Sequence, residues 1–591
     1  MKNILLLFLS DVKVFKGNVS VANYKYIGDT KTTNESAVRY LSKIKGAPPN
    51  KIFYFSSTKV KSLIKKDRNS TENFTEDGKT FTHVEYFENR IKDFIGGNIK
   101  EVMQPCNFDE DADIQQTMKV VVEMASMIQS YIGNDTNVTL NVDMTGGMRH
   151  ASLMMLVITR LIQYSGVKIG HILYSNFVPG RAENFVEESN DIYKMFDLIA
   201  GAEEFVRFGS VEAIQGYFAN REIPKVLQDL LDAMNKFAEA IKISRRREFQ
   251  KALEGLKNAY EKFSAESRNF SAGKDIPSLN YNLMQQLEVR IAKEYSTLLK
   301  CPADDYVSII EWCLAHGYIQ QALVLYTESF PYMMIAKHHI VGLNPIYDKE
   351  LADYTDKDGM KREKDFLLIN DFDPKKYPDG SNYNSKPIFD AYDDFIRRLQ
   401  SAIQSIRLNK FKMETFNKDN ISEYWVGMFN IIQSDYDNYV ELLEELQTLK
   451  SNPDLTADIK TVAEKFSTLY SFWDLIPKNI FKIPVNQRAD KIFETLCNAE
   501  PSAFRIKTNN TLIIHHMIMH DILRLNVIDE KTFLKIIDRY FIIKSERNDS
   551  VHATRRPKEL IGDANSEISY ATLLKGYMND GLNEYSEAIK I

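Results

Sequence analysis

Residues 138–164 read VTLNVDMTGGMRHASLMMLVITRLIQY, and this stretch decides the fold of the first part of the chain. Residues 138–142 are a short apolar run of strand length, residues 148–164 are helical in pattern, and residues 167–174 form another strand candidate. A strand, a glycine-containing turn, a helix and a second strand in this order indicate a βαβ unit, whose two strands lie parallel in one sheet.

The same alternation extends back to the start of the chain. Further strand candidates are residues 2–9, 51–55 and, more weakly, 99–103. Residues 34–44 are helical in pattern, and residues 113–132 carry apolar side chains at helical spacing. We therefore expect an α/β domain with a parallel sheet over residues 1–190.

Beyond about residue 190 the strand signal disappears and helical patterns dominate. The expected helices are 195–218, 226–263, 279–299, 307–327, 389–406, 424–449, 455–475, 510–525 and 531–544. We expect residues 191–225 to form a helical linker and residues 226–591 to form an all-α region. Residues 344–386 are rich in Asp, Lys, Tyr, Asn, Pro and Gly, which indicates a surface insertion, with a substrate-gating loop as the alternative.

The overall composition is that of a folded chain without a global affinity for nucleic acid. Of its 591 residues 44% are hydrophobic, and the formal net charge is −6, so any contact with nucleic acid must come from a local basic patch. The four cysteines are scattered, which argues against a disulfide framework or a zinc site and favours a cytoplasmic location. The apolar runs are too short to predict a signal peptide or a membrane span.

The turn after the central strand is the first candidate site. Gly146 and Gly147 let the backbone turn tightly and approach a ligand closely. The helix that follows offers free N–H groups to an anion, and Arg149 in its first turn can fork onto a phosphate. Thr145 can donate its hydroxyl, whereas Asp143 fits phosphate poorly and is expected to orient the loop or to meet a base or ribose. The alternative is an ordinary strand-to-helix turn with a surface arginine.

Other nucleotide-binding patterns do not fit. No GxGxxG motif follows a strand, so the dinucleotide fingerprint is absent from the sequence. Gly78-Lys79-Thr80 resembles the end of a P-loop, but Asn73 stands where the first glycine is required. A strand or turn also follows where a P-loop needs a helix, so we reject this match.

The segment from Asp143 to Arg149 resembles the ligand motif of CARF domains, the Rossmann-like nucleotide-sensing modules of type III CRISPR systems. Ser10 and Asp11, at the end of the first strand candidate, fit the other ligand loop of that family. The resemblance covers about residues 1–185 and implies a dimer that binds cyclic oligoadenylate across its two-fold axis. The ligand candidates that it implies are Ser10, Asp11, Thr145, Gly146, Gly147 and Arg149, with Asn176 as a weaker one.

A second candidate site lies in residues 545–553, which read SERNDSVHA. On one helix Asn548 and His552 share a face, whereas Arg547 lies about 140° from His552 around the axis. Arg547 must therefore reach around, or the backbone must break near Ser545, which can serve as an N-cap. His552 can exchange a proton near neutral pH, and Arg547 can stabilise charge on a phosphorane. A polar helix end with a surface histidine is the alternative.

The string Arg547-Asn548-x-x-x-His552 in a long helical region resembles the HEPN ribonuclease signature. Residues 310–314 and 320–323 and Glu328 also resemble the helical part of the CARF–HEPN family, and we interpret them as core and scaffold. The resemblance implies a homodimeric endoribonuclease of antiviral defence that cyclic oligoadenylate activates allosterically. It would cut single-stranded RNA without metal or other cofactor through Arg547, Asn548 and His552, leaving 2′,3′-cyclic phosphate and 5′-hydroxyl ends.

Two alternatives stay open. One is a cyclic-oligonucleotide sensor with a different effector, although neither the His/Cys set of a deaminase nor the carboxylate–lysine cluster of a DNA nuclease is recognisable. The other is a sensor with a non-catalytic helical domain that binds a partner.

Other histidines and cations of the helical region are interpreted as follows. We interpret His515, His516 and His520 as packed helix residues, because no carboxylate joins them at the spacing of a zinc protease. The local basic patch is assigned to Arg555, Arg556 and Lys558.

Overall fold

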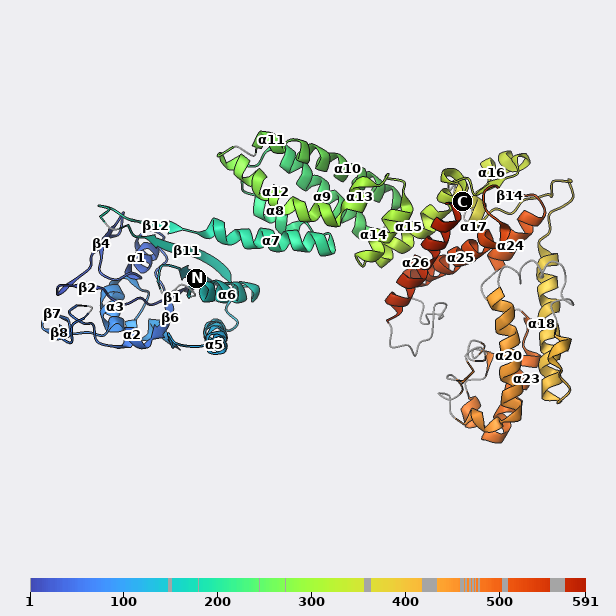
Figure 1. Cartoon of the computed structure of the whole chain (residues 1–591), viewed down its shortest axis with the longest axis horizontal. Helices are drawn as coiled ribbons and strands as arrows, with labels where there is room; N and C mark the ends of the chain where they lie inside the picture. The colour runs from blue at the N-terminus through green and yellow to red at the C-terminus, as the bar shows by residue number, and fades with distance from the viewer. Residues whose placement is uncertain are drawn as a thin grey trace. The chain divides into compact units, whose positions relative to one another are not determined.

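The computed structural model divides the chain into two compact units, Met1–Gly201 and Ala202–Ile591, which are described separately (Figure 1). The structure describes all residues except 1, 68, 147–150, 179, 244, 271–272, 356–362, 417–432, 458–461, 463–464, 467–468, 470–471, 473–474, 477–478, 502–508, 553–568 and 591. For residues 433–438, 509, 549–552 and 570 it describes the backbone alone. The boundary between the units falls inside the segment 191–225 that was expected to be a linker.

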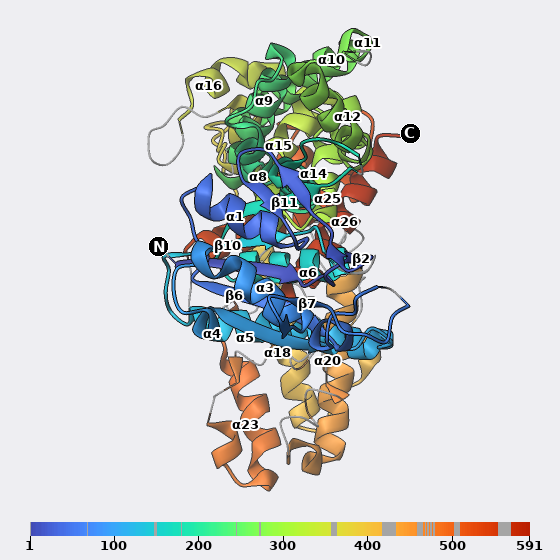
Figure 2. The ribbon, with the colours of Figure 1, turned by 90° about the vertical axis from the view of Figure 1, so that its left-hand side faces the viewer.

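A six-stranded sheet in the order β12-β11-β10-β1-β6-β9 forms the centre of the first unit (Figure 2). Its strands are β1 (Lys2–Phe8), β6 (Lys51–Ser57), β9 (Met103–Phe108), β10 (Val138–Asp143), β11 (Lys168–Asn176) and β12 (Phe185–Glu188). All neighbouring pairs are parallel except β11 and β12. The prediction of an α/β unit with a parallel sheet is confirmed, and β12 adds an antiparallel edge strand that the sequence pattern did not indicate.

Helices cover both faces of this sheet. They are α1 (Glu35–Lys43), α3 (His83–Ile91), α5 (Ile114–Ile132) and α6 (Ala151–Tyr164). Leu5 and Leu7 of β1 pack in one core with α1 and α3, while Ile4 and Leu6 pack in the other core with α5 and α6. Because side chains alternate along a strand, β1 supplies both cores with successive residues. The fold is therefore a doubly wound α/β layer structure.

The direction of winding reverses between β1 and β10. From β1 the chain continues to β6 and β9 on one side, and β10 then returns to the other side of β1 and leads to β11. In open α/β sheets, ligands bind outside the carboxyl ends of the strands at such a reversal. The loops after β1 and β10, which carry most of the expected ligand residues, both begin at this point.

Short elements complete the first unit. They are β2 (Val14–Phe15), β3 (Asn18–Val19), β4 (Ala22–Tyr24), β5 (Gly28–Thr30), α2 (Thr58–Lys61), β7 (Thr75–Glu76), β8 (Lys79–Thr80), the 3-10 helix η1 (Lys92–Phe94) and α4 (Ile99–Val102). Asp77 and Gly78 join β7 to β8 with φ of 52° and 75°. Two left-handed residues in succession are typical of a tight hairpin turn. The segment Gly78-Lys79-Thr80 thus belongs to a hairpin, in agreement with the rejection of a P-loop.

The second unit is predominantly helical, as predicted. α7 (Asn190–Phe208) spans the boundary between the units. The helices that follow are α8 (Glu212–Phe218), α9 (Lys225–Ile243), α10 (Arg246–Ala265), α11 (Ser267–Phe270), α12 (Ile276–Glu294), α13 (Ser296–Lys300), α14 (Tyr306–Ala315), α15 (Ile319–Tyr332), α16 (Asp348–Asp353), α17 (Lys364–Asn370), α18 (Lys386–Arg407), α20 (Gln433–Ser451), α23 (Val485–Asn498), α24 (Asn509–Met519), α25 (Glu530–His552) and α26 (Tyr570–Ala588). Single turns of 3-10 or π helix are η2 (Met333–Lys337), η3 (Pro345–Tyr347), η4 (Met413–Thr415), η6 (Pro453–Thr456) and η8 (Ile480–Lys482).

Several expected helices are interrupted. The pattern over 226–263 falls into α9 and α10, that over 279–299 into α12 and α13, and that over 307–327 into α14 and α15. Between α14 and α15, Gly317 has a φ of 80°, a left-handed conformation that glycine adopts without strain. The spacing of apolar residues does not indicate such short turns, because the helices on both sides of the turn have the same helical spacing.

One expected helix ends in a strand. The pattern predicts a helix over 510–525, but α24 ends at Met519, and β14 (Leu523–Leu525) pairs antiparallel with β13 (Val341–Leu343). Asp521 turns the chain out of the helix with a φ of 54°. A three-residue strand whose partner lies far along the chain leaves no local signal, so the prediction of a wholly helical region is wrong at this point.

Residues 344–386 are more than a surface insertion. They contain η3, α16 and α17, and Leu367, Leu368 and Ile369 of α17 are buried. Asn370 donates a hydrogen bond to the Tyr540 hydroxyl of α25 at 2.9 Å. The polar composition of this segment therefore gave no indication of α17, a short helix that packs into the core of the second unit.

Asp538 of α25 is a carboxyl group whose burial affects stability. Thr511 donates a hydrogen bond to it at 3.2 Å, yet burial raises the pKa of Asp538 to about 6. Because the folded protein binds this proton more tightly than the unfolded chain, its stability falls as the pH rises from the ordinary pKa of 3.8 to about 6.

We expect Asp538→Asn to remove this loss of stability. The melting temperature of the variant should match that of the wild type near pH 4 and exceed it by a few degrees near pH 8, equivalent to roughly 1–3 kcal/mol. Asp580→Asn is the control, because Asp580 is exposed on the neighbouring helix α26. A difference between Asp538→Asn and wild type that stays the same at both pH values would contradict the raised pKa.

Candidate functional site

A buried carboxylate holds the loop after β10. Asp143 ends this strand and has no exposed surface. Its Oδ2 accepts a hydrogen bond from Asn34 Nδ2 at 2.8 Å, and its Oδ1 accepts from the Thr145 amide at 3.0 Å and from the Thr145 hydroxyl. That hydroxyl also accepts from the Ser175 amide at 2.8 Å. Burial raises the pKa of Asp143, and these hydrogen bonds oppose the rise. Asp143 thus orients the loop, one of the two roles expected for it.

Asn34 joins the loop after β10 to the loop after β1. Its Oδ1 accepts a hydrogen bond from the Ser10 amide at 3.0 Å, while its Nδ2 donates to Asp143. Asn34 stands at the N-cap of α1 but makes no side-chain cap bond there. An asparagine before a helix is usually interpreted as a cap, so no sequence signal indicates that its amide is used across the sheet edge.

Gly146 brings the two loops into direct contact. A Cβ atom at this position would lie 2.2 Å from the carbonyl oxygen of Phe8 and 2.7 Å from the hydroxyl of Ser10. Such distances leave room for glycine alone. The structure therefore brings Ser10, Thr145 and Gly146 together, and as ligand contacts they stay predictions. Gly147 and Arg149 lie outside the described residues.

Two further ligand candidates have partners of their own. Asp11 forms an ion pair with Lys59 at 2.7 Å. Asn176, the last residue of β11, donates to Glu187 of β12 at 2.9 Å. Lys59 was not among the expected site residues, although it adds a positive charge beside the loop after β1. As ligand contacts, Asp11 and Asn176 stay predictions.

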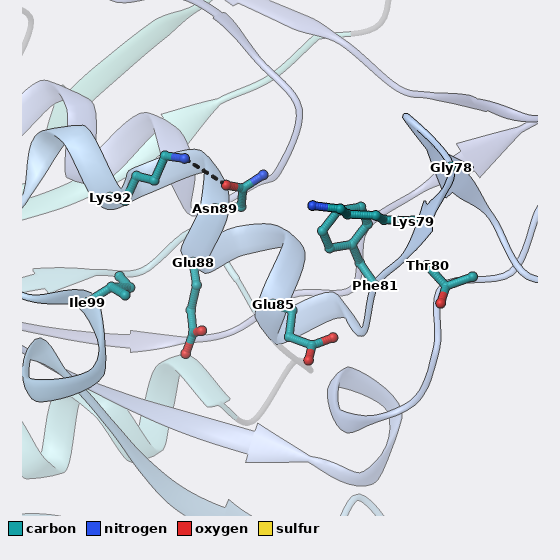
Figure 3. Close-up of a pocket in the computed structure, with 9 residues that line it drawn as sticks. All are labelled: Gly78, Lys79, Thr80, Phe81, Glu85, Glu88, Asn89, Lys92 and Ile99. Atoms are coloured by element: carbon teal, nitrogen blue, oxygen red, sulfur yellow. Dashed lines mark hydrogen bonds between the residues drawn. The ribbon is translucent and has the colours of Figure 1, made fainter.

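An open cavity of about 620 Å³ in the first unit lies away from these loops (Figure 3). It is lined by the β7–β8 hairpin, by α3 and by the first residues of η1 and α4, at Gly78, Lys79, Thr80, Phe81, Glu85, Glu88, Asn89, Lys92 and Ile99. Glu85 accepts a hydrogen bond from the Thr82 amide at 2.8 Å and so caps its own helix, and Lys92 donates to Asn89 at 3.1 Å. None of the expected ligand residues that the structure describes lines this cavity.

The second candidate site lies on α25, which is continuous from Glu530 to His552. The backbone therefore does not break near Ser545, and whether Arg547 reaches around the helix toward His552 stays a prediction. Arg547 and His552 remain about 140° apart around the axis. The side chain of His552 lies outside the described atoms.

A buried tyrosine positions α25 against two other helices. The Tyr540 hydroxyl donates to the carbonyl oxygen of Thr327 on α15 at 3.1 Å and lies within hydrogen-bond distance of Asn370 on α17. One turn later, Lys544 donates to Asn370 Oδ1 at 2.6 Å. On the other side, Arg539 makes two hydrogen bonds of 3.0 and 2.9 Å to Glu584 of α26. The segment that leads to Arg547 is thus fixed from three directions.

Arg547 itself lies between an amide and a carboxylate. Its Nη1 donates to Asn548 Oδ1 at 3.3 Å, and its Nη2 lies 3.4 Å from Glu328 Oε1 on α15. Glu328 was interpreted from the sequence as scaffold, but the structure places it beside the candidate catalytic arginine. Both contacts are longer than a typical charge-assisted hydrogen bond.

Arg547 lines a cavity of about 390 Å³ that is rich in cations. The lining side chains are Arg245, Arg246, Arg247, Glu248, Thr327, Glu328, Glu363, Phe366, Lys544 and Arg547, of which five are cationic and three acidic. The basic patch assigned to Arg555, Arg556 and Lys558 lies outside the described residues. The three consecutive arginines 245–247 were missed, although their run is a readable signal for a local basic patch.

The histidines of α24 are packed, as expected. His515 pairs with Glu530 at 2.6 Å, and His516 lies 2.9 Å from the Tyr377 hydroxyl. Burial, with the neighbouring His520, lowers the pKa of His516 to about 4. Within the described part of the chain, no group of three or more His, Cys, Asp or Glu side chains is arranged to hold a metal ion. Among the same residues, no helix combines the length and hydropathy needed to span a bilayer.

Comparison with solved structures gives likenesses of fold, whereas the comparisons of sequence give none. No protein-family model matches the chain, and no curated protein matches its sequence. Among solved structures it is similar to Enterococcus italicus Csm6 bound to cyclic hexa-2'-fluoro-hexa-dAMP, over 84% of this chain and 100% of that one, with 12% identity and a TM-score of 0.21. A TM-score this low supports no inference about function.

We expect Gly146→Ala to destabilise the first unit, because the added Cβ would overlap the Phe8 carbonyl and force β1 and the loop apart. The cost should be about 1–3 kcal/mol, the usual range for overpacking. Amide hydrogen exchange in β1 and β10 should accelerate. Gly97→Ala is the control, since its Cβ would meet only Val102 Cγ2 at 3.4 Å. Equal exchange in the two variants would show that the loops do not depend on this close approach.

Proposed function

We propose that this chain is a homodimeric CARF–HEPN endoribonuclease of type III CRISPR defence. Cyclic oligoadenylate bound by the first unit would activate the second unit, which would cut single-stranded RNA without a metal ion. The observation that carries the proposal is that Arg547 and Asn548 lie together on one continuous helix, with Arg547 lining a cation-rich cavity and His552 one turn beyond Asn548.

The proposed chemistry uses groups of this chain alone. His552 would take the proton of the ribose 2′-hydroxyl or give one to the leaving 5′-oxygen. Arg547 would stabilise the charge that develops on the phosphorane oxygens. Its contact to Glu328 at 3.4 Å is long, so a phosphate can replace the carboxylate at modest cost. Asn548, bonded to Arg547, would orient that guanidinium or the phosphate.

The proposed sensor site is the crevice where the winding of the sheet reverses. Ser10, Gly146, Gly147 and Arg149 would contact cyclic oligoadenylate, with Asp11 and Asn176 at its border. For Thr145 the hydrogen bonds to Asp143 and Ser175 favour a positioning role, because its hydroxyl already donates its proton to one and accepts from the other. The resemblance to CARF domains names the ligand, and the ordered contact between the two loops supports a site there.

An exposed apolar face supports the proposed dimer. On α5 the exposed fractions of Ile114, Met118 and Val122 are 73%, 63% and 61%. On the neighbouring α6, Leu153 and Val157 are also exposed. Residues four apart share a helix face, and contiguous apolar surface of this kind marks protein interfaces. Because α6 follows the candidate loop directly, a second copy seated on this face would bring two ligand loops together.

The central prediction is RNA cleavage that depends on cyclic oligoadenylate and persists in EDTA. Fluorescent single-stranded RNA would be incubated with rings of four or six adenylates and without them. His552→Ala should abolish cutting while ligand binding stays at the wild-type level. Activity that EDTA removes and a divalent ion restores would defeat the proposed chemistry, and cleavage without any ring would defeat the proposed regulation.

Arg149→Ala should weaken ligand binding and activation by about ten- to a hundredfold through loss of a charge-assisted bond.

The placement of Arg547 and His552 around one helix predicts a site shared by two chains. Wild-type and His552→Ala protomers would be mixed, with subunit exchange verified and ligand saturating. If both histidines are needed, activity should fall roughly as the square of the wild-type fraction. A linear fall of activity with the wild-type fraction would mean that each chain has a self-sufficient site.

Val157→Asp on the exposed face should give monomers that do not cut, as measured by light scattering and the same assay.

A further inference from the structure

The cavity beside Arg547 is built from segments that are far apart in the sequence. Arg245, Arg246 and Arg247 lie at the start of α10, whereas Lys544 and Arg547 lie on α25, and all five line the same space. The chain carries a net charge of −6, yet the lining of this cavity has more cations than carboxylates. A local excess of positive charge in a hollow attracts anions despite the overall charge.

One carboxylate occupies this cation cluster. Glu363 Oε2 lies 2.5 Å from Arg246 Nη2, and Glu363 Oε1 lies 3.1 Å from Arg247 Nη2. Each oxygen of the carboxylate is thus held by a different guanidinium. Burial works against the charged form, but hydrogen bonds from Arg247 and Arg246 outweigh it and keep the pKa of Glu363 below its usual range. The geometry is that of an anion held by two arginines.

Neutral oxygen atoms orient the cations. Arg246 Nη1 donates to the carbonyl oxygen of Glu328 at 3.0 Å, and its side chain is only 13% exposed. Lys544 donates to the amide oxygen of Asn370. These contacts to neutral oxygen atoms help to fix the direction of both side chains. Arg247, by contrast, is 75% exposed and reaches the cavity from solvent.

We propose that Arg245, Arg246, Arg247 and Lys544 form a subsite for backbone phosphates of the RNA, next to the cleavage site, and that Glu363 occupies it until RNA binds. The two oxygens of a phosphodiester can replace the two carboxylate oxygens on the same pair of guanidiniums. The subsite would hold the strand on one side of the scissile phosphate, which Arg547 meets in the same cavity. This inference rests on the proposed ribonuclease function.

The subsite predicts opposite effects of its two kinds of residue on RNA affinity. All variants would be made in full-length His552→Ala protein, which should bind RNA without cutting it, with saturating cyclic oligoadenylate. Affinity for a short fluorescent single-stranded RNA would be measured by anisotropy across a series of salt concentrations. Arg245→Ala with Arg247→Ala should weaken binding about tenfold or more and reduce the slope of log K against log salt by about 0.7 for each phosphate that is no longer neutralised.

Glu363→Gln should instead strengthen RNA binding several-fold, because the internal competitor loses its charge while its size stays the same. Misfolding cannot produce such a gain, so this variant tests the subsite independently of the arginine variant. Arg290→Ala is the matched control: this arginine is 57% exposed, pairs with Glu203 at 3.7 Å and does not line the cavity. Its affinity and salt slope should equal those of the parent protein.

The outcomes separate the subsite from the proposed function. If protein with an intact His552 cuts RNA but the double arginine variant has the salt slope of the control, the subsite is overturned and the ribonuclease stands. Weaker RNA binding by Glu363→Gln would overturn the assignment of Glu363 as the occupant. If protein with an intact His552 cuts no RNA with any ring size, the proposed function fails, and the subsite falls with it.

Discussion

The arrangement of α15, α17 and α25 in the second unit depends on the hydrogen bonds of the Tyr540 hydroxyl. This hydroxyl joins α25 to the carbonyl of Thr327 on α15 and to Asn370 on α17, within a core where the tyrosine is fully buried. Burial raises the pKa of Tyr540 far above its usual range, so the group stays a neutral donor. Removing it would leave the buried carbonyl of Thr327 and the half-buried amide of Asn370 without this partner, which costs more than the hydrogen bonds themselves contribute. Arg547, Glu328 and the cation-rich cavity lie directly beyond this junction.

The first unit uses the amide of Asn34 in the same way. One side chain bonds to Ser10 after β1 and to Asp143 at the end of β10, so it ties the two loops at the reversal of the sheet to each other. The buried Asp143 is held by hydrogen bonds from neutral groups, Asn34 and Thr145. These bonds therefore use no cation that an anionic ligand would need. In both units a neutral polar side chain holds segments distant in sequence at the place where chemistry is proposed.

Patterns of neighbouring residues predicted the elements that form through contacts close together in the chain. The βαβ order around β10 predicted parallel strands, and apolar spacing predicted most helices, because both depend on residues close together in the chain. Asp143, Thr145 and Gly146 were found because they form one contiguous motif. Asn34 and Glu363 were missed and Glu328 was interpreted only as scaffold, since each reaches its site only when distant elements pack. The same reason explains β13 and β14, which are too short to leave a periodic signal, and α17, whose apolar residues stand inside a polar stretch.

The unbroken course of α25 limits how a switch can act on the proposed nuclease. An α-helix is stiff over its length, with a rise of about 1.5 Å per residue, so the backbone positions of Arg547 and His552 on α25 move together as one rigid helix. Rotating or sliding this helix moves both positions together, and the angle of about 140° between them around the axis is preserved. In the proposed dimer, control exerted from elsewhere would therefore act on the spacing or angle between the α25 helices of the two chains. Activation would then be a matter of assembly geometry, and a ligand that leaves this spacing unchanged would bind without effect.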